Sequence, residues 1–126
     1  PEIESGGTEM RTKEIVMALR ELGVPADLLG YEYLKCAIGF CLDDRSYIQM
    51  LTKRLYPAIA EKFDTTSTRV ERAIRHAIEV CWSRGNVATL DRYFGYTINS
   101  KKDRSTNGEF IATVVEQLRL EQETAG

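Results

Sequence analysis

The chain has 126 residues, of which 43% are hydrophobic and 29% are charged, and its formal net charge is −2. These values are typical of a single globular domain. No run of about 18 apolar residues occurs, and residues 1–10 have neither a basic start nor an apolar centre. The sequence therefore argues against a membrane partner and against a secretory signal.

The charges are distributed unevenly along the chain. Residues 1–44 hold four Lys and Arg against nine Asp and Glu, residues 45–104 hold twelve against six, and residues 105–126 hold one against four. The negative total argues against a nucleic-acid partner, but a polyanion is bound mainly through local positive potential. The basic middle of the chain is where such a partner would bind.

The three cysteines, Cys36, Cys41 and Cys81, all lie in helix-like apolar patterns. Their odd number argues against a set of disulfides, and the single histidine of the chain argues against a zinc site. We expect reduced, packed thiols, no metal or other cofactor, and a cytoplasmic protein.

The first third of the chain predicts two helices. Residues 1–10 are acidic and Gly-rich, and we expect them to be a linker tail of a longer protein rather than an element. From Arg11 to Leu22 apolar residues recur at helical spacing, and Gly23 ends this helix. The pattern from Tyr31 to Leu42 predicts the second helix.

Two short helices should follow. The first is predicted over Ser46 to Leu55, and the second over Tyr56 to Phe63. Pro57 fits the first turn of the latter, because its missing N–H would have no partner within the helix there.

A long amphipathic helix is predicted to begin near Thr66 and to run to about Arg84, where Gly85 ends it. Both Thr66 and Thr68 offer capping oxygens, so the start is uncertain by about two residues. The apolar stripe of this helix consists of Val70, Ala73, Ile74, Ala77, Ile78 and Cys81.

The rest of the long helix is polar and largely basic. Guanidinium groups, a carboxylate and small hydroxyls are the groups that contact phosphates and base edges in DNA. The macrodipole disfavours cations in the N-terminal half by up to about 1 kcal/mol each, a cost that a ligand phosphate or guanine would offset. The candidate DNA-binding residues here are Thr66, Ser67, Thr68, Arg69, Glu71, Arg72, Arg75 and His76.

The predicted short helix over Tyr56–Phe63 and the long helix are separated by a three-residue turn, which fits a helix-turn-helix. Ala60 suits a close crossing of the two helices, and Val70 would pack back from the second. Asp64 stands where a turn glycine is usual, and aspartate tolerates the left-handed conformation.

The C-terminal third predicts two more helices. Thr89 to Phe94 forms a short one. The basic loop that follows contains Lys101 and Lys102, which are either a phosphate clamp or ordinary exposed lysines. Thr106 and Glu109 have the spacing of a capping box that opens the last helix. We expect residues 11–121 to form an all-α, six-helix domain with a helix-turn-helix, and residues 122–126 to be a tail.

Each functional interpretation has a structural alternative. The arginines could form a solvated face of i,i+4 ion pairs, and His76 is more simply structural or phosphate-touching than catalytic. Glu71 would be repelled by phosphate, so it fits DNA only by accepting from a cytosine or by orienting an arginine. The sequence has no Cys–His or Ser–His pair at usable spacing and no glycine-rich phosphate-binding loop, so nothing in it points to an enzyme. The serious rival is a helical module that binds only other proteins.

The segment Ser67–Asn86 closely resembles the recognition helix of the C-terminal effector domains of the stage zero sporulation protein A family. Further motifs are similar to the same family, and together they cover about Arg11 to Glu121. These motifs are Leu22-Gly23-Val24-Pro25, Gly30-Tyr31-x-Tyr33-Leu34, Leu55-Tyr56-Pro57-x-Ile59-Ala60-x-Lys62-Phe63, Phe94-Gly95-Tyr96-Thr97, and Phe110-Ile111-Ala112 with Leu118-Arg119-Leu120-Glu121.

This resemblance implies a six-helical transcription factor domain of endospore-forming bacteria. Such a domain binds short, often tandem boxes in double-stranded DNA, with a possible head-to-tail dimer on DNA, and activates or represses promoters. A phosphorylated receiver domain, which this sequence does not contain, would control it within a two-component phosphorelay.

The resemblance also implies roles for individual residues. Glu71 and Arg72 would touch bases, and Arg69, Arg75 and His76 would complete the contacts to bases and phosphates. The surface that meets the sigma factor of RNA polymerase would comprise Gly85, Thr89, Phe94 and Ile98.

Overall fold

The structure is a computed structural model that describes the backbone of residues 2–95 and 105–125. Over these residues the chain is all-α, as predicted, with six α-helices and no strand. Among them, no helix is both long and apolar enough to cross a bilayer. The helices are α1 (Glu2–Leu22), α2 (Leu29–Asp43), α3 (Tyr56–Phe63), α4 (Ser67–Arg84), α5 (Val87–Phe94) and α6 (Asn107–Ala125).

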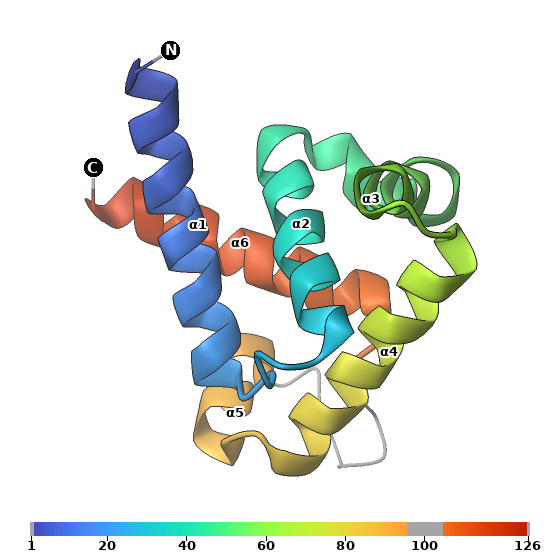
Figure 1. The fold of residues 1–126 in the computed structure, drawn as a ribbon. Helices are drawn as coiled ribbons and strands as arrows, with labels where there is room; N and C mark the ends of the chain where they lie inside the picture. The colour runs from blue at the N-terminus through green and yellow to red at the C-terminus, as the bar shows by residue number, and fades with distance from the viewer. Residues whose placement is uncertain (1, 96–104, 126) are drawn as a thin grey trace.

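Helix α2 lies at the centre of the fold. It contacts α1, α3, α4 and α6, and Figure 1 shows α1 on one side of it and α4 on the other. This position explains its composition, because a helix surrounded by neighbours must be apolar on more than one face. The side chains of Leu34, Ala37, Ile38 and Cys41 are completely buried.

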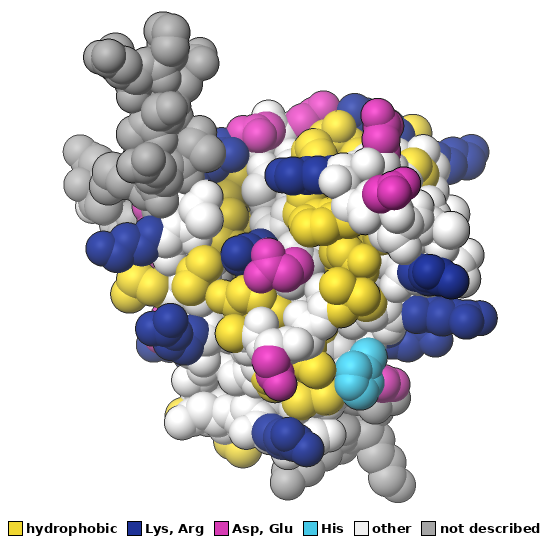
Figure 2. Space-filling model, in the orientation of Figure 1, with side chains coloured by type: hydrophobic (Ala, Val, Ile, Leu, Met, Phe, Trp, Pro, Cys, Tyr) yellow, Lys and Arg dark blue, Asp and Glu magenta, His cyan; other side chains and the backbone are white. Residues whose placement is uncertain are grey.

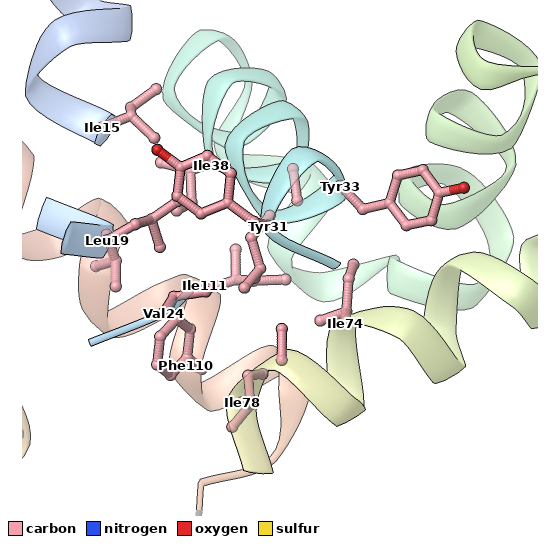
Figure 3. Close-up of a cluster of buried hydrophobic side chains, with 14 of the residues drawn as sticks. Ile15, Leu19, Val24, Tyr31, Tyr33, Ile38, Ile74, Ile78, Phe110 and Ile111 are labelled. Carbon is pink, nitrogen blue, oxygen red and sulfur yellow. The ribbon is translucent and has the colours of Figure 1, made fainter. Parts of the chain in front are cut away.

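The core is one continuous cluster between these helices. Figure 3 shows Leu19 of α1, Ile38 of α2, Ile74 of α4 and Phe110 of α6 converging on it. Each of the four is fully buried. Burying such a side chain contributes roughly 1.5–3 kcal/mol, so this cluster holds α4 in place from behind.

A glycine lets α2 and α4 approach each other closely. A Cβ built on Gly30 would lie 2.1 Å from the carbonyl oxygen of Ala73 and 2.8 Å from the Cβ of Ala77. No larger residue fits at Gly30 without separating the helices. The small side chains at this crossing therefore determine how deeply α4 is seated.

The first and last helices are longer than predicted. Helix α1 begins at Glu2, so the prediction that residues 1–10 form no element was wrong. Extending an existing helix by a residue is much easier than nucleating one, so a helix that packs on the core from Ile15 onward can continue towards the N-terminus. Helix α6 likewise continues to Ala125, through most of the predicted tail at 122–126.

The prediction of one helix over Ser46–Leu55 was also wrong. The structure has a 3₁₀ turn, η1 (Arg45–Gln49), followed by a π-helical turn, η2 (Leu51–Leu55). In an α-helix the ring of Pro57 would clash with the carbonyl four residues earlier. In η2 the N–H of Leu55 instead donates five residues back, to the Met50 carbonyl at 3.0 Å, and this wider turn leads into α3.

The predicted turn between α3 and α4 is confirmed in detail. Helix α3 spans the predicted residues, and Asp64 adopts the left-handed conformation with φ 53° and ψ 53°. The hydroxyl of Thr66 accepts a hydrogen bond from the N–H of Arg69 at 3.2 Å. Thr66 is therefore the N-cap of α4, which settles the uncertainty between Thr66 and Thr68, and the geometry is compatible with a helix-turn-helix.

Candidate nucleic-acid interface

The buried side of α4 determines which of its residues face outward. Val70, Ile74, Ala77 and Cys81 are all completely buried, and they recur at steps of three and four residues. Since about 3.6 residues make one turn, these four residues define a single inward face. The residues between them must lie on the sides and on the outer face.

The candidate residues occupy that outer surface. Figure 2 shows dark blue Lys and Arg side chains gathered along the right-hand edge, on the side where Figure 1 has α3 and α4. Ser67 and Glu71 are half-buried at the border of the surface. The candidates whose side chains are exposed are Thr66, Thr68, Arg69, Arg72, Arg75 and His76.

Two of the three arginines on this surface are not neutralised within the described part of the chain. Arg75 forms an i,i+4 ion pair with Glu71, which raises the pKa of Arg75 through a hydrogen bond and through charge. Within residues 11–95 and 105–124, whose side chains the structure describes, neither Arg69 nor Arg72 has a carboxylate within ion-pair distance. The alternative of a fully paired, solvated face therefore describes only Glu71 and Arg75.

This surface combines guanidinium groups without a carboxylate partner among the described residues and side chains that are already bonded within the domain. Arg69 and Arg72 present guanidinium forks that suit phosphates and guanine edges. The Glu71 carboxylate holds the guanidinium of Arg75, which is one of the two arrangements that make an acidic residue compatible with DNA. Thr66 is occupied as the helix cap, so its hydroxyl accepts from the chain itself.

The residues predicted to meet the sigma factor differ in burial. Phe94 is buried, and its ring centroid lies 5.1 Å from that of Trp82 and 5.7 Å from that of Phe110. It therefore supports the surface from beneath. Thr89 is half-buried on α5, next to Val87, which is 69% exposed. Val87 gave no signal in the sequence, since only the tertiary fold shows which apolar residues of α5 stay outside.

Gly85 lies at a tight junction. A Cβ built on it would lie 2.4 Å from the Cys81 carbonyl oxygen and 2.5 Å from the Leu22 carbonyl oxygen. Its first role is therefore structural. The remaining predicted site residues, Ile98 of the sigma surface and Lys101 and Lys102 of the DNA surface, lie outside the described residues.

One residue near the interface, Asn107, gave no signal in the sequence. Asn107 of α6 donates hydrogen bonds to the hydroxyl of Tyr56 in α3 and to the main-chain carbonyl of Glu71 in α4. The predicted capping box is confirmed by reciprocal bonds between Thr106 and Glu109 at 2.8 and 3.1 Å. That motif indicates where α6 begins, but it cannot indicate which other helices the start of α6 touches.

The cysteines are free in the structure. Cys41 and Cys81 are buried and Cys36 is half-buried. Burial raises the pKa of Cys81 to about 12, and burial together with the Asp44 charge raises that of Cys41 to about 11. Within the described residues, no cluster of His, Cys, Asp and Glu is arranged to hold a metal ion.

The chain matches a known protein family over most of its length. Residues 15–118 match the family model described as "Sporulation initiation factor Spo0A C terminal". The match runs from the middle of α1 to the last turns of α6 and includes all of α3 and α4.

Proposed function

The chain belongs to the Spo0A C-terminal family of sporulation initiation factors, and we propose that it reads short DNA boxes through the outer surface of α4. Membership of this family makes the chain a DNA-binding regulator of sporulation. One observation carries the proposal about α4. Arg69, Arg72 and Arg75 lie in the N-terminal half of α4, which follows a compact turn from α3, and they are exposed outside its buried stripe.

In the proposed complex, the N-terminal half of α4 enters the major groove. The second helix of a helix-turn-helix contacts base edges with its first turns. Arg72 reads a guanine through its two-pronged donor group, while Glu71 accepts from a cytosine amino group or aims Arg75. Arg69 and His76, which flank the same surface, contact phosphates.

Direct binding measurements test this proposal. We expect a duplex recovered by selection from a random library to bind the domain with a steep loss of affinity as salt rises, because bound arginines release counterions. Footprinting should protect a discrete box, or two neighbouring boxes. Sequence-blind protection, or binding that salt hardly changes, would instead favour a module that binds only proteins.

For activation, we propose that the exposed side of α5 meets the sigma factor of RNA polymerase. Val87 and Thr89 lie immediately beyond the end of α4, so a polymerase subunit bound beside the DNA could reach them. Gly85 and Phe94 shape this surface without forming its centre, because Gly85 fills a tight junction and Phe94 is buried.

Regulation follows the pattern of the family resemblance. We propose that head-to-tail copies occupy tandem boxes, that promoters are activated or repressed according to where the boxes lie, and that a phosphorylated receiver domain releases the DNA-binding domain. Such a protein works in the cytoplasm, where the chromosome is, and performs no catalysis of its own. Head-to-tail contacts join two different surfaces and need not close into a symmetric dimer. Such contacts can therefore form only when two copies are held side by side on DNA.

A further inference from the structure

Asn107, the first residue of α6, contacts both helices of the α3–α4 pair. Its Nδ2 donates one hydrogen bond to the Tyr56 hydroxyl oxygen at 3.1 Å and another to the Glu71 main-chain carbonyl oxygen at 3.2 Å. Tyr56 belongs to α3 and Glu71 to α4. A single side-chain amide therefore joins three helices beside the proposed DNA surface.

The chemistry of the amide makes this contact specific. A carbonyl oxygen only accepts hydrogen bonds, so the Glu71 carbonyl requires the donor nitrogen of Asn107 and not its oxygen. Both bonds of Nδ2 are partly buried, so losing them leaves polar groups poorly solvated. Tyr56 is itself buried, and burial raises the pKa of its hydroxyl, which therefore stays protonated at neutral pH.

Asn107 projects from a firmly held end of α6. Thr106 and Glu109 exchange hydrogen bonds that cap the helix. The hydroxyl of Ser105 accepts from the indole N–H of Trp82 at 3.2 Å, which attaches the same segment to the C-terminal half of α4. The amide therefore holds the Glu71 backbone relative to a fixed point.

We propose that Asn107 is a positioning residue for DNA recognition, which holds the backbone of α4 at Glu71 and thereby aims Arg72 and Arg75. Arg72 directly follows Glu71, and Arg75 is ion-paired with the Glu71 carboxylate. A shift of the backbone at Glu71 therefore moves both guanidinium groups. Base edges demand accurate placement of a guanidinium, whereas phosphates accept a wider range of positions.

The experiment compares two DNA duplexes, and it rests on the proposed DNA-binding function. One duplex is recovered by selection from a random library with the wild-type domain, and the other has the same base composition with the protected box scrambled. We expect Asn107→Ala to weaken binding to the selected duplex about three- to tenfold, as for the loss of one or two hydrogen bonds. Binding to the scrambled duplex and its salt dependence should not change.

Two further variants separate positioning from general stability. Asn107→Ser retains a residue that suits the start of a helix but is too short to make both bonds, and it should reproduce the effect of Ala. Ser105→Ala removes the hydrogen bond of this segment to Trp82 in α4 and leaves both bonds of Asn107 in place, so it should leave the ratio of the two affinities unchanged. Thermal unfolding of each variant establishes that the folded domain is being compared.

The outcomes are distinguishable. A fall in the affinity ratio for both Asn107 variants, without one for Ser105→Ala, supports the inference. An unchanged ratio, an equal loss on both duplexes, or an equal fall for Ser105→Ala overturns it. If the wild-type domain shows no preference for any selected duplex, then the proposed DNA function fails instead.

Discussion

Gly85 and Leu22 meet so closely that a Cβ on Gly85 would lie 2.5 Å from the Leu22 carbonyl oxygen. This contact joins the end of α4 to the end of α1. The thiol of Cys81 donates to the same carbonyl at 3.2 Å, so both residues fasten one junction. The junction lies between the proposed DNA surface and the proposed sigma surface. A substitution at Gly85 therefore changes the stability of the domain as well as the sigma surface.

We expect Gly85→Asp to destabilise the whole domain and not only to abolish activation. Forcing extra atoms into a packed site typically costs about 1–3 kcal/mol, and here the neighbouring atoms are backbone. Chemical denaturation measures the effect. Gly39→Ala is the matched control, because a Cβ there meets nothing within 4 Å and alanine favours a helix. Unchanged stability of Gly85→Asp would refute the tight junction.

Arg72→Ala should cost roughly 1–3 kcal/mol on the selected duplex and relax the preference at one base pair. The reason is that Arg72 is exposed on the outer surface of α4 and has no carboxylate partner within the described residues. Fluorescence anisotropy on single-base variants of the duplex measures both effects. Arg20→Ala, an exposed arginine on α1, should bind like the wild type. If both variants lost the same affinity for the selected duplex, then Arg72 would contribute only its positive charge and not a specific contact.

Glu71→Gln should release Arg75 and remove a negative charge from the surface. We expect tighter binding to scrambled DNA, because the repulsion of phosphate disappears, together with a smaller difference between the selected and scrambled duplexes. Titrations at two salt concentrations test this combination. If both affinities rise equally, Glu71 has no part in sequence discrimination.

Val87→Glu should reduce activated transcription while leaving DNA binding intact. Val87 is 69% exposed at the start of α5, so the substitution does not disturb the core. In vitro transcription and footprinting on the same promoter compare the two activities. Phe94→Ala is a poor test, because truncating a buried phenylalanine costs about 3–5 kcal/mol. A parallel loss of DNA binding in Val87→Glu would argue against a separate sigma surface.

The stability of the domain should fall as the pH rises above about 9. The pKa of Cys81 is raised by burial from 9.0 to about 12, and that of Tyr93 by burial and by Glu21 and Glu121 from 10.0 to about 12. Both groups stay protonated up to a higher pH in the folded state than in the unfolded state. Their contribution to stability is therefore complete below the unfolded pKa and lost as pH rises through the folded one. Denaturation midpoints from pH 8 to 11 should decline, and less steeply in Cys81→Ala.

Several features of the site follow from local sequence and were predicted correctly. Asp64 adopts the left-handed conformation because a short polar side chain tolerates it. Thr66, one of the two caps that the sequence left open, caps α4 because its oxygen reaches the N–H of Arg69. The stripe from Val70 to Cys81 is buried as its spacing requires. In each case the deciding interactions lie within a few residues along the chain.

Other features depend on contacts between residues far apart in sequence. Nothing near Asn107 predicts that it bonds to Glu71, 36 residues earlier, and nothing near Gly85 predicts the carbonyl of Leu22. The burial of Phe94 depends on Phe110 and Trp82 in the same way. The single helix predicted over Ser46–Leu55 was wrong for a more local reason. Apolar spacing cannot distinguish an α-helix from a 3₁₀ turn followed by a π turn.

By itself, the sequence determined the helical class of this protein, the limits of α3, the extent of α4 to within about two residues at its start, and the residues that form the outer surface of α4. Periodicity and capping are properties of neighbouring residues, so they can be read directly from the chain. Only the tertiary structure decided how deeply α4 is seated, which apolar residues of α5 remain outside, and that Asn107 holds Glu71. These depend on where distant segments meet, which the packing of the whole core determines.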